Sequence, residues 1–205
     1  MSDVAVENTG ATLPETALTA ALGRRSIVLV GMMGAGKSSI GRRLAARLSL
    51  PFVDADSEIE KAASMTIPEI FTAHGEAYFR AGEARVIARL LEGGPQVLAT
   101  GGGAFMNPET RAAIRAKGIS IWLNATFEIL MRRVKRRADR PMLAGPDPIE
   151  ALTRLIEERY PFYAEAELTV ESRDVPHETI VGEIISKLCS HASLTGGVNT
   201  EARDQ

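Results

Sequence analysis

The chain has 205 residues, of which 45% are hydrophobic, and a formal net charge of -2 at pH 7. This length supports one sizeable core rather than two domains. The charge balance gives no overall field that would attract nucleic acid or an anionic membrane, and the longest apolar runs are far short of a membrane span. The single cysteine, Cys189, excludes a disulfide framework and is typical of a protein in the reducing cytoplasm.

The two ends of the chain are expected to carry no chemistry. Residues 1–24 contain Asp3, Glu7 and Glu15 and lack the basic segment and long apolar run of a secretory signal, so a disordered N-terminal extension is expected there. Residues 191–205, which are mixed and polar, are expected to form a flexible tail. Residues 25–190 are then expected to fold as a single domain.

The predicted elements begin with a β-branched run, Ser26–Val30, which is typical of a strand buried on both faces of a parallel sheet. Apolar residues at helical spacing predict a helix over Lys37–Leu48. Later strands are predicted over residues 51–53, 96–100, 119–123 and 168–170. A helix is predicted to start near Pro68, behind a cap at Thr66 or Ile67, and another to end before Gly118 after running over Pro108–Lys117. Further helices are predicted over residues 75–91, 127–136 and 179–188, and from residue 149 to an end or bend near Pro161.

Strands that alternate with helices predict an α/β fold. The expected architecture is a three-layer sandwich with a five-stranded parallel sheet. In such sheets ligands bind beyond the carboxyl ends of the strands, and the motifs below lie at those ends.

The turn after the first strand is rich in glycine. From Gly31 to Ser38 it matches G-x-x-x-x-G-K-[ST], with the required strand before it and helix after it. Glycines let backbone N–H groups converge on a phosphate, and the helix adds its positive N-terminal end. Lys37 would reach the phosphate oxygens and the Ser38 hydroxyl would bind Mg²⁺. The motif predicts nucleoside triphosphate binding without naming a reaction, and a chance glycine-rich turn is the alternative.

Two aspartates follow the second predicted strand. Asp54 and Asp56 are two positions apart, so both carboxylates would point the same way if strand geometry persists. Mg²⁺ prefers oxygen ligands and usually keeps several waters. Asp54 would hold such a water near Ser38, and Asp56 would face an acceptor hydroxyl. The alternative is a solvated strand end at which Asp56 caps the next helix.

Two arginines and a glycine triplet lie farther along the chain. An arginine placed like Arg80 usually pairs with a carboxylate such as Glu83 on a solvated helix face. The triplet over residues 101–103 follows a strand, and glycines there are favoured where backbone approaches a ligand closely, with a flexible turn as the alternative. Arg159, near a helix end, would by itself be read as a surface residue.

Residues 132–141 hold the only concentrated positive charge in the sequence. A nucleic-acid patch is one interpretation, but the aromatic residues that stack on bases are missing nearby. A lid over about residues 137–148, which are rich in proline, is the other. Its closure would bring a guanidinium group to the transferred phosphoryl group, where negative charge builds up.

Together these motifs resemble the shikimate kinase family over roughly residues 26–188. The resemblance rests on the P-loop from Gly31 to Ser38, Asp54-Ala55-Asp56, Phe79-Arg80, Gly101-Gly102-Gly103, Arg140-Pro141-Met142-Leu143 and Arg159-Tyr160-Pro161. It implies the fold of the nucleoside monophosphate kinases, with a substrate-binding helical segment at about residues 56–83. It also implies a cytoplasmic monomer that phosphorylates the 3-hydroxyl of shikimate with ATP, in aromatic amino acid biosynthesis.

The resemblance implies a nucleotide end of the site. Its ATP-binding set is Gly34, Ala35, Gly36, Lys37, Ser38, Ser39, Arg133 and Arg140. In this set Lys37 contacts phosphate, Arg133 packs on adenine, and Arg140 closes with the lid onto the phosphates. Mg²⁺ binds Ser38 directly and Asp54 through a water. Ser39 by itself reads as an ordinary helix residue.

The resemblance also implies an acceptor end. Its substrate-binding set is Asp56, Arg80, Gly101, Gly102, Gly103 and Arg159. Arg80 and Arg159 bind the carboxylate, which paired guanidinium N–H donors suit better than lysine does. Asp56 orients the hydroxyl and takes its proton late in the reaction. Lys37, Asp56 and Arg140 are the implied catalytic residues, and positioning and charge neutralisation supply most of the rate.

Several alternatives stay open. A gluconate kinase would share Lys37 and Ser38 but would not require the glycine triplet, and a nucleoside monophosphate kinase should show its own acceptor pattern. A GTPase should carry an Asn-Lys-x-Asp motif, which is absent from the sequence. A nucleic-acid-binding protein would use the basic stretch. The segment near Ser172 and Arg173 departs from the family pattern, so no adenine contact is carried over to it.

Overall fold

The computed structural model describes residues 15–135 and 147–196, the last four of them by their backbone only. Its centre is one five-stranded parallel sheet in the order β2-β3-β1-β4-β5. The strands are β1 (Ser26–Val30), β2 (Phe52–Asp54), β3 (Val97–Ala99), β4 (Gly118–Asn124) and β5 (Leu168–Glu171). The predicted α/β fold and parallel sheet are confirmed.

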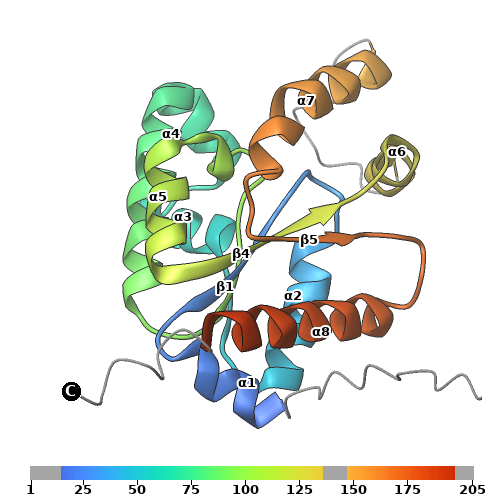
Figure 1. Ribbon diagram of the computed structural model, residues 1–205. Coiled ribbons are helices and arrows are strands. Elements are labelled where there is room, and N and C mark those ends of the chain that lie inside the picture. The colour runs from blue at the N-terminus through green and yellow to red at the C-terminus, as the bar shows by residue number, and fades with distance from the viewer. Residues whose placement is uncertain (1–14, 136–146, 197–205) are drawn as a thin grey trace, which may run out of the picture.

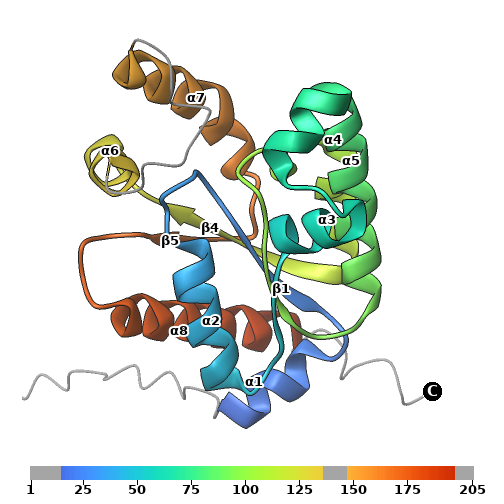
Figure 2. The same cartoon turned by 180° about the vertical axis from the view of Figure 1, so that it is seen from behind.

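Helices cover both faces of the sheet, which gives the expected three layers (Figures 1 and 2). On one side α1 (Glu15–Leu22), α2 (Lys37–Leu48) and α8 (His177–Gly196) pack together, and on the other side α3 (Ala55–Ala63), α4 (Ile67–Glu92) and α5 (Pro108–Lys117) do so. The remaining elements are the 3-10 turn η1 (Ala104–Met106), α6 (Phe127–Lys135) and α7 (Pro148–Tyr163). Figure 1 shows α6 and α7 at the end of the sheet where the turn after β1 lies.

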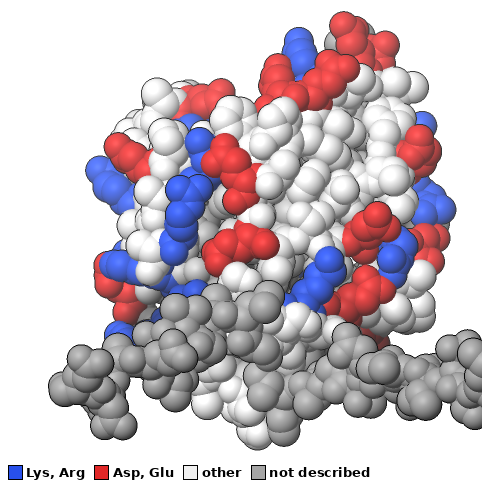
Figure 3. Space-filling model, in the orientation of Figure 1, with Lys and Arg blue, Asp and Glu red and all other residues white. Residues whose placement is uncertain are grey.

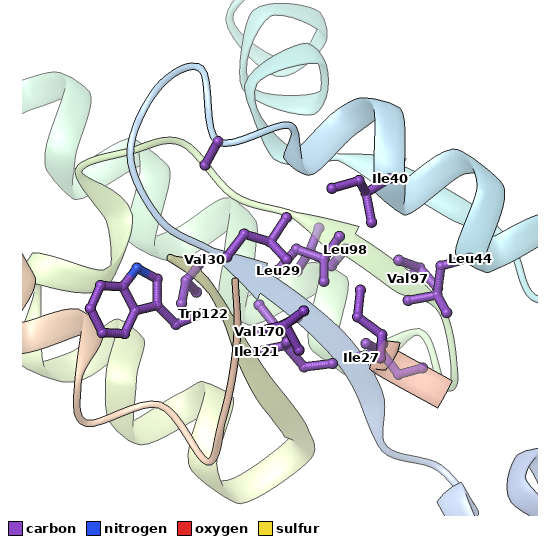
Figure 4. Close-up of a cluster of buried hydrophobic side chains, with 14 of the residues drawn as sticks. Ile27, Leu29, Val30, Ile40, Leu44, Val97, Leu98, Ile121, Trp122 and Val170 are labelled. Carbon is purple, nitrogen blue, oxygen red and sulfur yellow. The ribbon is translucent and has the colours of Figure 1, made fainter. Parts of the chain in front are cut away.

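The central strand β1 has an almost continuous apolar sequence because it is buried along its whole length. Its five residues are all buried, and it pairs with β3 on one side and β4 on the other. Figure 4 shows Ile27 and Leu29 of this strand among the side chains of Ile40 and Leu44 from α2. Each such side chain contributes about 1.5–3 kcal/mol when fully buried. This packing fixes the start of α2 relative to the end of β1, and so positions the turn between them.

The second helical segment begins where the sequence predicts. Thr66 caps α4 in a capping box with Glu69, and Pro68 stands in the first turn. The helix is interrupted at Gly75, which has φ 79° and ψ 174°, so the two helices predicted around this glycine are joined at a kink. The substrate-binding segment predicted over residues 56–83 therefore corresponds to α3 and the first part of α4.

The expected N-terminal boundary is wrong, because residues 15–22 of the predicted disordered extension form helix α1. Leu18 and Leu22 lie one helical turn apart and are both buried, at 0% and 2% exposure, and Glu15 pairs with Arg47 of α2 at 2.7 Å. At the other end α8 continues to Gly196, so the tail predicted to start at residue 191 begins as helix. Residues 1–14 and 197–205 lie outside the described part of the chain.

Of two predicted helix ends, one differs and one is confirmed. Gly118 is extended, with φ -142°, and is the first residue of β4 rather than a left-handed helix terminus. The predicted end near Pro161 is confirmed, because α7 ends two residues later, at Tyr163. Tyr160 and Tyr163 of this last turn donate hydrogen bonds to the carbonyls of Ala125 and Gly102.

The predicted lid lies almost wholly outside the described residues. Of the segment 137–148 only Asp147 and Pro148 are described, and they cap and begin α7. Arg140 is among the residues left outside. Over the described ranges, none of the helices combines the length and the apolar character that crossing a bilayer requires.

Candidate active site

The turn between β1 and α2 has the backbone that a phosphate cradle requires. Gly34 and Gly36 have φ of 83° and 96°, in the left-handed region where residues with a Cβ are strained. The turn is also pressed against the sheet, since a Cβ on Gly31 would lie 2.8 Å from the carbonyl oxygen of Leu123. The turn and the N-terminus of α2 together present backbone N–H groups and a positive helix end.

Three polar side chains line the cradle. The Lys37 ammonium donates to the carbonyls of Gly31 and Met32 at 2.7 and 3.0 Å. The Ser38 hydroxyl donates to Asp54 Oδ2 at 2.8 Å. Hydroxyl and carboxylate oxygens side by side are donors that suit Mg²⁺, which commonly binds one or two protein oxygens together with substrate phosphates and waters.

Asp54 and Asp56 do not share strand geometry as the sequence suggested. The helix α3 already starts at Ala55, so Asp54 is its N-cap residue and Asp56 lies in its first turn. Nor does Asp56 cap that helix, which was the alternative. Both carboxylates nevertheless line one cavity, because the helix starts at the carboxyl end of the sheet.

This cavity joins the two ends of the predicted site. Its volume is about 480 Å³. The lining residues come from the P-loop (Met33, Gly34, Gly36, Lys37, Ser38, Ser39), the aspartate pair (Asp54, Asp56), the end of β3 (Thr100, Gly101, Gly102), α6 (Arg133, Val134) and the segment before α8 (Asp174, Val175, His177). A separate hollow of about 600 Å³ lies between α4 and α5, and Arg80 is among the residues that line it. The smaller cavity is the one that brings together the P-loop, both aspartates and the start of the glycine triplet.

The glycine triplet is the point where the acceptor residues converge. A Cβ on Gly101 would lie 2.7 Å from Asp56 Oδ1, one on Gly102 would lie 3.4 Å from an Arg159 nitrogen, and one on Gly103 would lie 2.6 Å from Arg80 Cζ. A side chain at Gly101 or Gly103 would therefore displace a predicted acceptor residue, whereas one at Gly102 would lie in ordinary contact with Arg159. The triplet also lies against the P-loop, since a Cβ on Gly102 would be 3.6 Å from the Met33 backbone nitrogen.

Arg80 is held by a buried carboxylate, not by one on a solvated helix face. Its guanidinium donates to Glu83 at 2.8 Å and to Glu76 at 3.1 Å. Glu83 is only 2% exposed, and burial and the nearby Asp56 raise its pKa against the opposing effect of Arg80. Burial alone would lower the pKa of Arg80, but the two glutamates raise it. Glu83 therefore fixes the direction in which the guanidinium points.

Arg159 is buried rather than at the surface, with 7% exposure. Within the described ranges no carboxylate forms an ion pair with it, although it lies near enough to Glu83 to lower the pKa of that carboxyl. It hydrogen-bonds to Tyr163, whose pKa burial raises to about 12. A buried guanidinium is costly to leave unpaired, so this arrangement favours an incoming anion.

The nucleotide end of the cavity is closed by α6. Arg133 donates to the Gly34 carbonyl at 3.2 Å, to the Ser172 hydroxyl at 2.8 Å and to the Arg173 carbonyl at 2.7 Å, and burial lowers its pKa. Its neighbour Arg132 pairs with Asp174 at 3.1 Å. The segment around Ser172, to which the sequence assigned no role, thus lies directly beside the predicted adenine-contacting arginine.

Sequence reasoning missed three residues of this site. Glu83 was read only as a surface partner of Arg80, and its spacing of three positions from Arg80 was the one available signal. Tyr163 donates to the Gly102 carbonyl, and Ser172 donates to the Ala35 carbonyl at 2.7 Å. Both of these contacts join residues more than 60 positions apart, so local patterns do not predict them.

Comparison with known proteins agrees with this geometry. The model of the shikimate kinase family matches residues 33–189. A shikimate kinase of Bradyrhizobium diazoefficiens is 67% identical over 178 residues, which are 87% of this chain and 86% of that protein. One of Rhodopseudomonas palustris is 66% identical over 174 residues, 85% of this chain and 86% of that protein.

A solved structure extends the likeness to three dimensions. The shikimate kinase of Acinetobacter baumannii in complex with shikimate superposes with a TM-score of 0.80 at 36% identity, covering 87% of this chain and 98% of that one. The family match spans the P-loop lysine, the glycine triplet, Arg80 and Arg159. By sequence and by fold, the chain belongs to the shikimate kinase family.

Proposed function

We propose that this chain transfers the γ-phosphoryl group of ATP to the 3-hydroxyl of shikimate, giving shikimate 3-phosphate and ADP, as a step of aromatic amino acid biosynthesis. The observation that carries the proposal is the convergence of Arg80, Arg159 and Asp56 on the glycine triplet, within contact distance of the P-loop. One cavity is lined by the P-loop and by Asp56, Gly101 and Gly102 of the acceptor set, so a single chain supplies donor and acceptor contacts. We therefore also propose that it acts as a monomer, in the cytoplasm.

The acceptor end suits a small ring that bears one carboxylate and several hydroxyls. Arg80 and Arg159 would bind the carboxylate through paired N–H donors, and the open backbone of residues 101–103 would let the ring lie flat against it. Asp56, whose Oδ1 would lie 2.7 Å from a Cβ on Gly101, would orient the hydroxyl that reacts. This arrangement fixes the acceptor by its charge at one edge and by its hydroxyls at the other.

The donor end suits a triphosphate. The P-loop N–H groups and α2 would bind the phosphates, and Lys37 would exchange its two carbonyl contacts for phosphate oxygens. Ser38 and Asp54 would hold Mg²⁺, Asp54 through a water, and the ion would neutralise charge on the phosphates. Arg133 would pack on adenine, and Arg140, outside the described residues, would close onto the phosphates.

In the proposed reaction the 3-hydroxyl oxygen attacks the γ-phosphorus. A new O–P bond forms while the bond to the β,γ-bridging oxygen breaks, and ADP leaves with that electron pair. The hydroxyl proton passes to the Asp56 carboxylate late in the step. Lys37 stabilises the charge that develops on the transferred group, so positioning and electrostatics supply most of the rate.

The nucleic-acid alternative is not favoured by the described side chains of α6. Arg132 and Arg133 turn toward Asp174 and the P-loop. On the face drawn in Figure 3, basic and acidic side chains are intermixed around an uncharged centre. A binding surface for nucleic acid would need basic side chains gathered on one face.

A coupled assay of ADP release tests the proposal. Shikimate should be phosphorylated far faster than gluconate, nucleoside monophosphates or water, and Lys37→Met should abolish turnover while the circular dichroism spectrum stays unchanged. Preference for another acceptor would contradict the assignment of substrate. Near wild-type turnover by the Lys37→Met protein would contradict the role of the P-loop.

A further inference from the structure

Ser172 lies where three separate segments meet. It is the residue after β5, it is 1% exposed, and its backbone N–H donates to the carbonyl of Asn124 at the end of β4. Its hydroxyl contacts both the P-loop, at the Ala35 carbonyl, and α6, at the Arg133 guanidinium. The contacts span 137 and 39 positions of the sequence respectively.

The directions of these two hydrogen bonds are fixed by the groups involved. A carbonyl oxygen only accepts, so the single hydroxyl proton of Ser172 points at Ala35, 2.7 Å away. A guanidinium only donates, so Arg133 gives its proton to a lone pair of the same hydroxyl at 2.8 Å. Donor, hydroxyl and acceptor therefore form one ordered chain from Arg133 through Ser172 to Ala35, and each bond polarises the other.

The same arginine reaches the P-loop by a second route. Arg133 also donates to the Gly34 carbonyl at 3.2 Å, and its other terminal nitrogen donates to the Arg173 carbonyl at 2.7 Å. Consecutive P-loop carbonyls, those of Gly34 and Ala35, are thus both bound from outside the turn. These two carbonyls of the turn are therefore held in place by residues outside it.

We propose that Ser172 is a positioning residue for nucleotide binding, which holds the P-loop turn and the Arg133 guanidinium in one preset arrangement before ATP enters. This Ser172 link (Arg133, Ser172 and Ala35) rests on the proposed function, because it presumes that the P-loop end of the cavity binds a nucleotide. Ordering of the turn and of a long side chain is then complete before binding, and preorganised groups bind more tightly.

The first test measures affinity for MgADP by isothermal titration calorimetry. Ser172→Ala should weaken binding about tenfold, the effect of losing one buried, charge-assisted hydrogen bond. Ser172→Thr keeps a hydroxyl and should restore affinity to within about twofold of wild type. Shikimate affinity should not change in either variant, because the link touches none of the acceptor residues.

Ser26→Ala is the matched control. Ser26 is likewise buried, at 0% exposure, and its hydroxyl likewise donates to a backbone carbonyl, that of Gly94 at 3.0 Å. It lies at the start of β1, at the opposite end of the sheet from the cavity. Thermal unfolding should show a comparable loss of stability in both alanine variants, while only Ser172→Ala loses MgADP affinity.

A double-mutant cycle with Arg133→Gln tests whether Ser172 and Arg133 act together on MgADP binding or act independently. If Ser172 acts through Arg133, the substitution of Arg133 should weaken MgADP binding less in the Ser172→Ala protein than in the wild type. Additive effects would overturn the proposal, as would a Ser172→Ala protein that binds MgADP as tightly as wild type does. Failure of the wild-type protein to bind MgADP would instead refute the proposed function itself.

Discussion

Arg80 and Arg159 differ in how each is held, although both point at the glycine triplet. Arg80 is fixed by Glu83 and Glu76 on its own helix. Arg159 is fixed by burial and by Tyr163. Neighbouring residues therefore neutralise Arg80 in part, whereas no described carboxylate pairs with Arg159. A substrate carboxylate would complete the charge balance of both.

Alanine in place of Arg80 or Arg159 should raise the KM for shikimate by about 10- to 100-fold, the loss expected for charge-assisted hydrogen bonds to a carboxylate. The KM for ATP should change little, because neither side chain lines the P-loop. Steady-state kinetics with each substrate varied in turn gives the two constants. An equal rise in both KM values would show that the arginines support the fold instead of binding the acceptor.

Tyr163 should make the stability of the protein sensitive to alkaline pH. Burial raises its pKa to about 12, above the value near 10 of an exposed tyrosine, so its neutral form is favoured in the folded state. The contribution of the neutral phenol to the free energy of unfolding is intact below pH 10. It is lost as the pH rises toward 12, by about 1.4 kcal/mol per pH unit.

Urea unfolding between pH 9 and pH 11 checks this behaviour. The wild-type protein should lose more stability across the interval than Tyr163→Phe does, because phenylalanine cannot ionise. At pH 8 the phenylalanine variant should already be less stable by about 1 kcal/mol, through loss of the hydrogen bond to Gly102. Parallel pH profiles for the two proteins would show that the phenol is not held neutral.

At the scale of elements, helix α1 lies against the P-loop helix α2. It packs with α8 and α2, through the buried side chains of Leu18 and Leu22. It lies far from the carboxyl ends of the strands, at the foot of the molecule in Figure 1. Its contribution should therefore be to stability and not to turnover.

Leu18→Ala should lower the free energy of unfolding by about 2–5 kcal/mol, as expected for a fully buried leucine. At a temperature where the variant is folded, kcat should match wild type. Thr16→Ala, at an exposed position of the same helix, is the control and should change neither quantity. A loss of kcat without a loss of stability would show that α1 communicates with the site.

The elements that sequence predicted well are those with a local cause. The β-branched run of β1, the spacing of Ile40 and Leu44 in α2, and the capping residue Thr66 each act within a few positions. α1 was missed because it is short and Leu18 and Leu22 are its only large apolar residues. The hydrogen bond from Tyr163 to Gly102 joins residues 61 positions apart, so no local pattern encodes it.

At the scale of the whole molecule, the fold brings the site together at one end of the sheet. The P-loop follows β1, Asp54 ends β2, and the glycine triplet follows β3, and these three strands are neighbours. Parallel strands place their carboxyl ends at the same edge, which is why the motifs could be grouped from sequence. The sequence did not predict which face each side chain would occupy, because that depends on where α3, α4 and α7 pack.

The crystal structure of the protein with shikimate and a non-hydrolysable ATP analogue tests the central claim most directly. The account predicts the phosphates within the turn from Gly31 to Ser38, the carboxylate of shikimate between Arg80 and Arg159, and its 3-hydroxyl beside Asp56. Either molecule bound outside the cavity, or a carboxylate that contacts neither arginine, would contradict it.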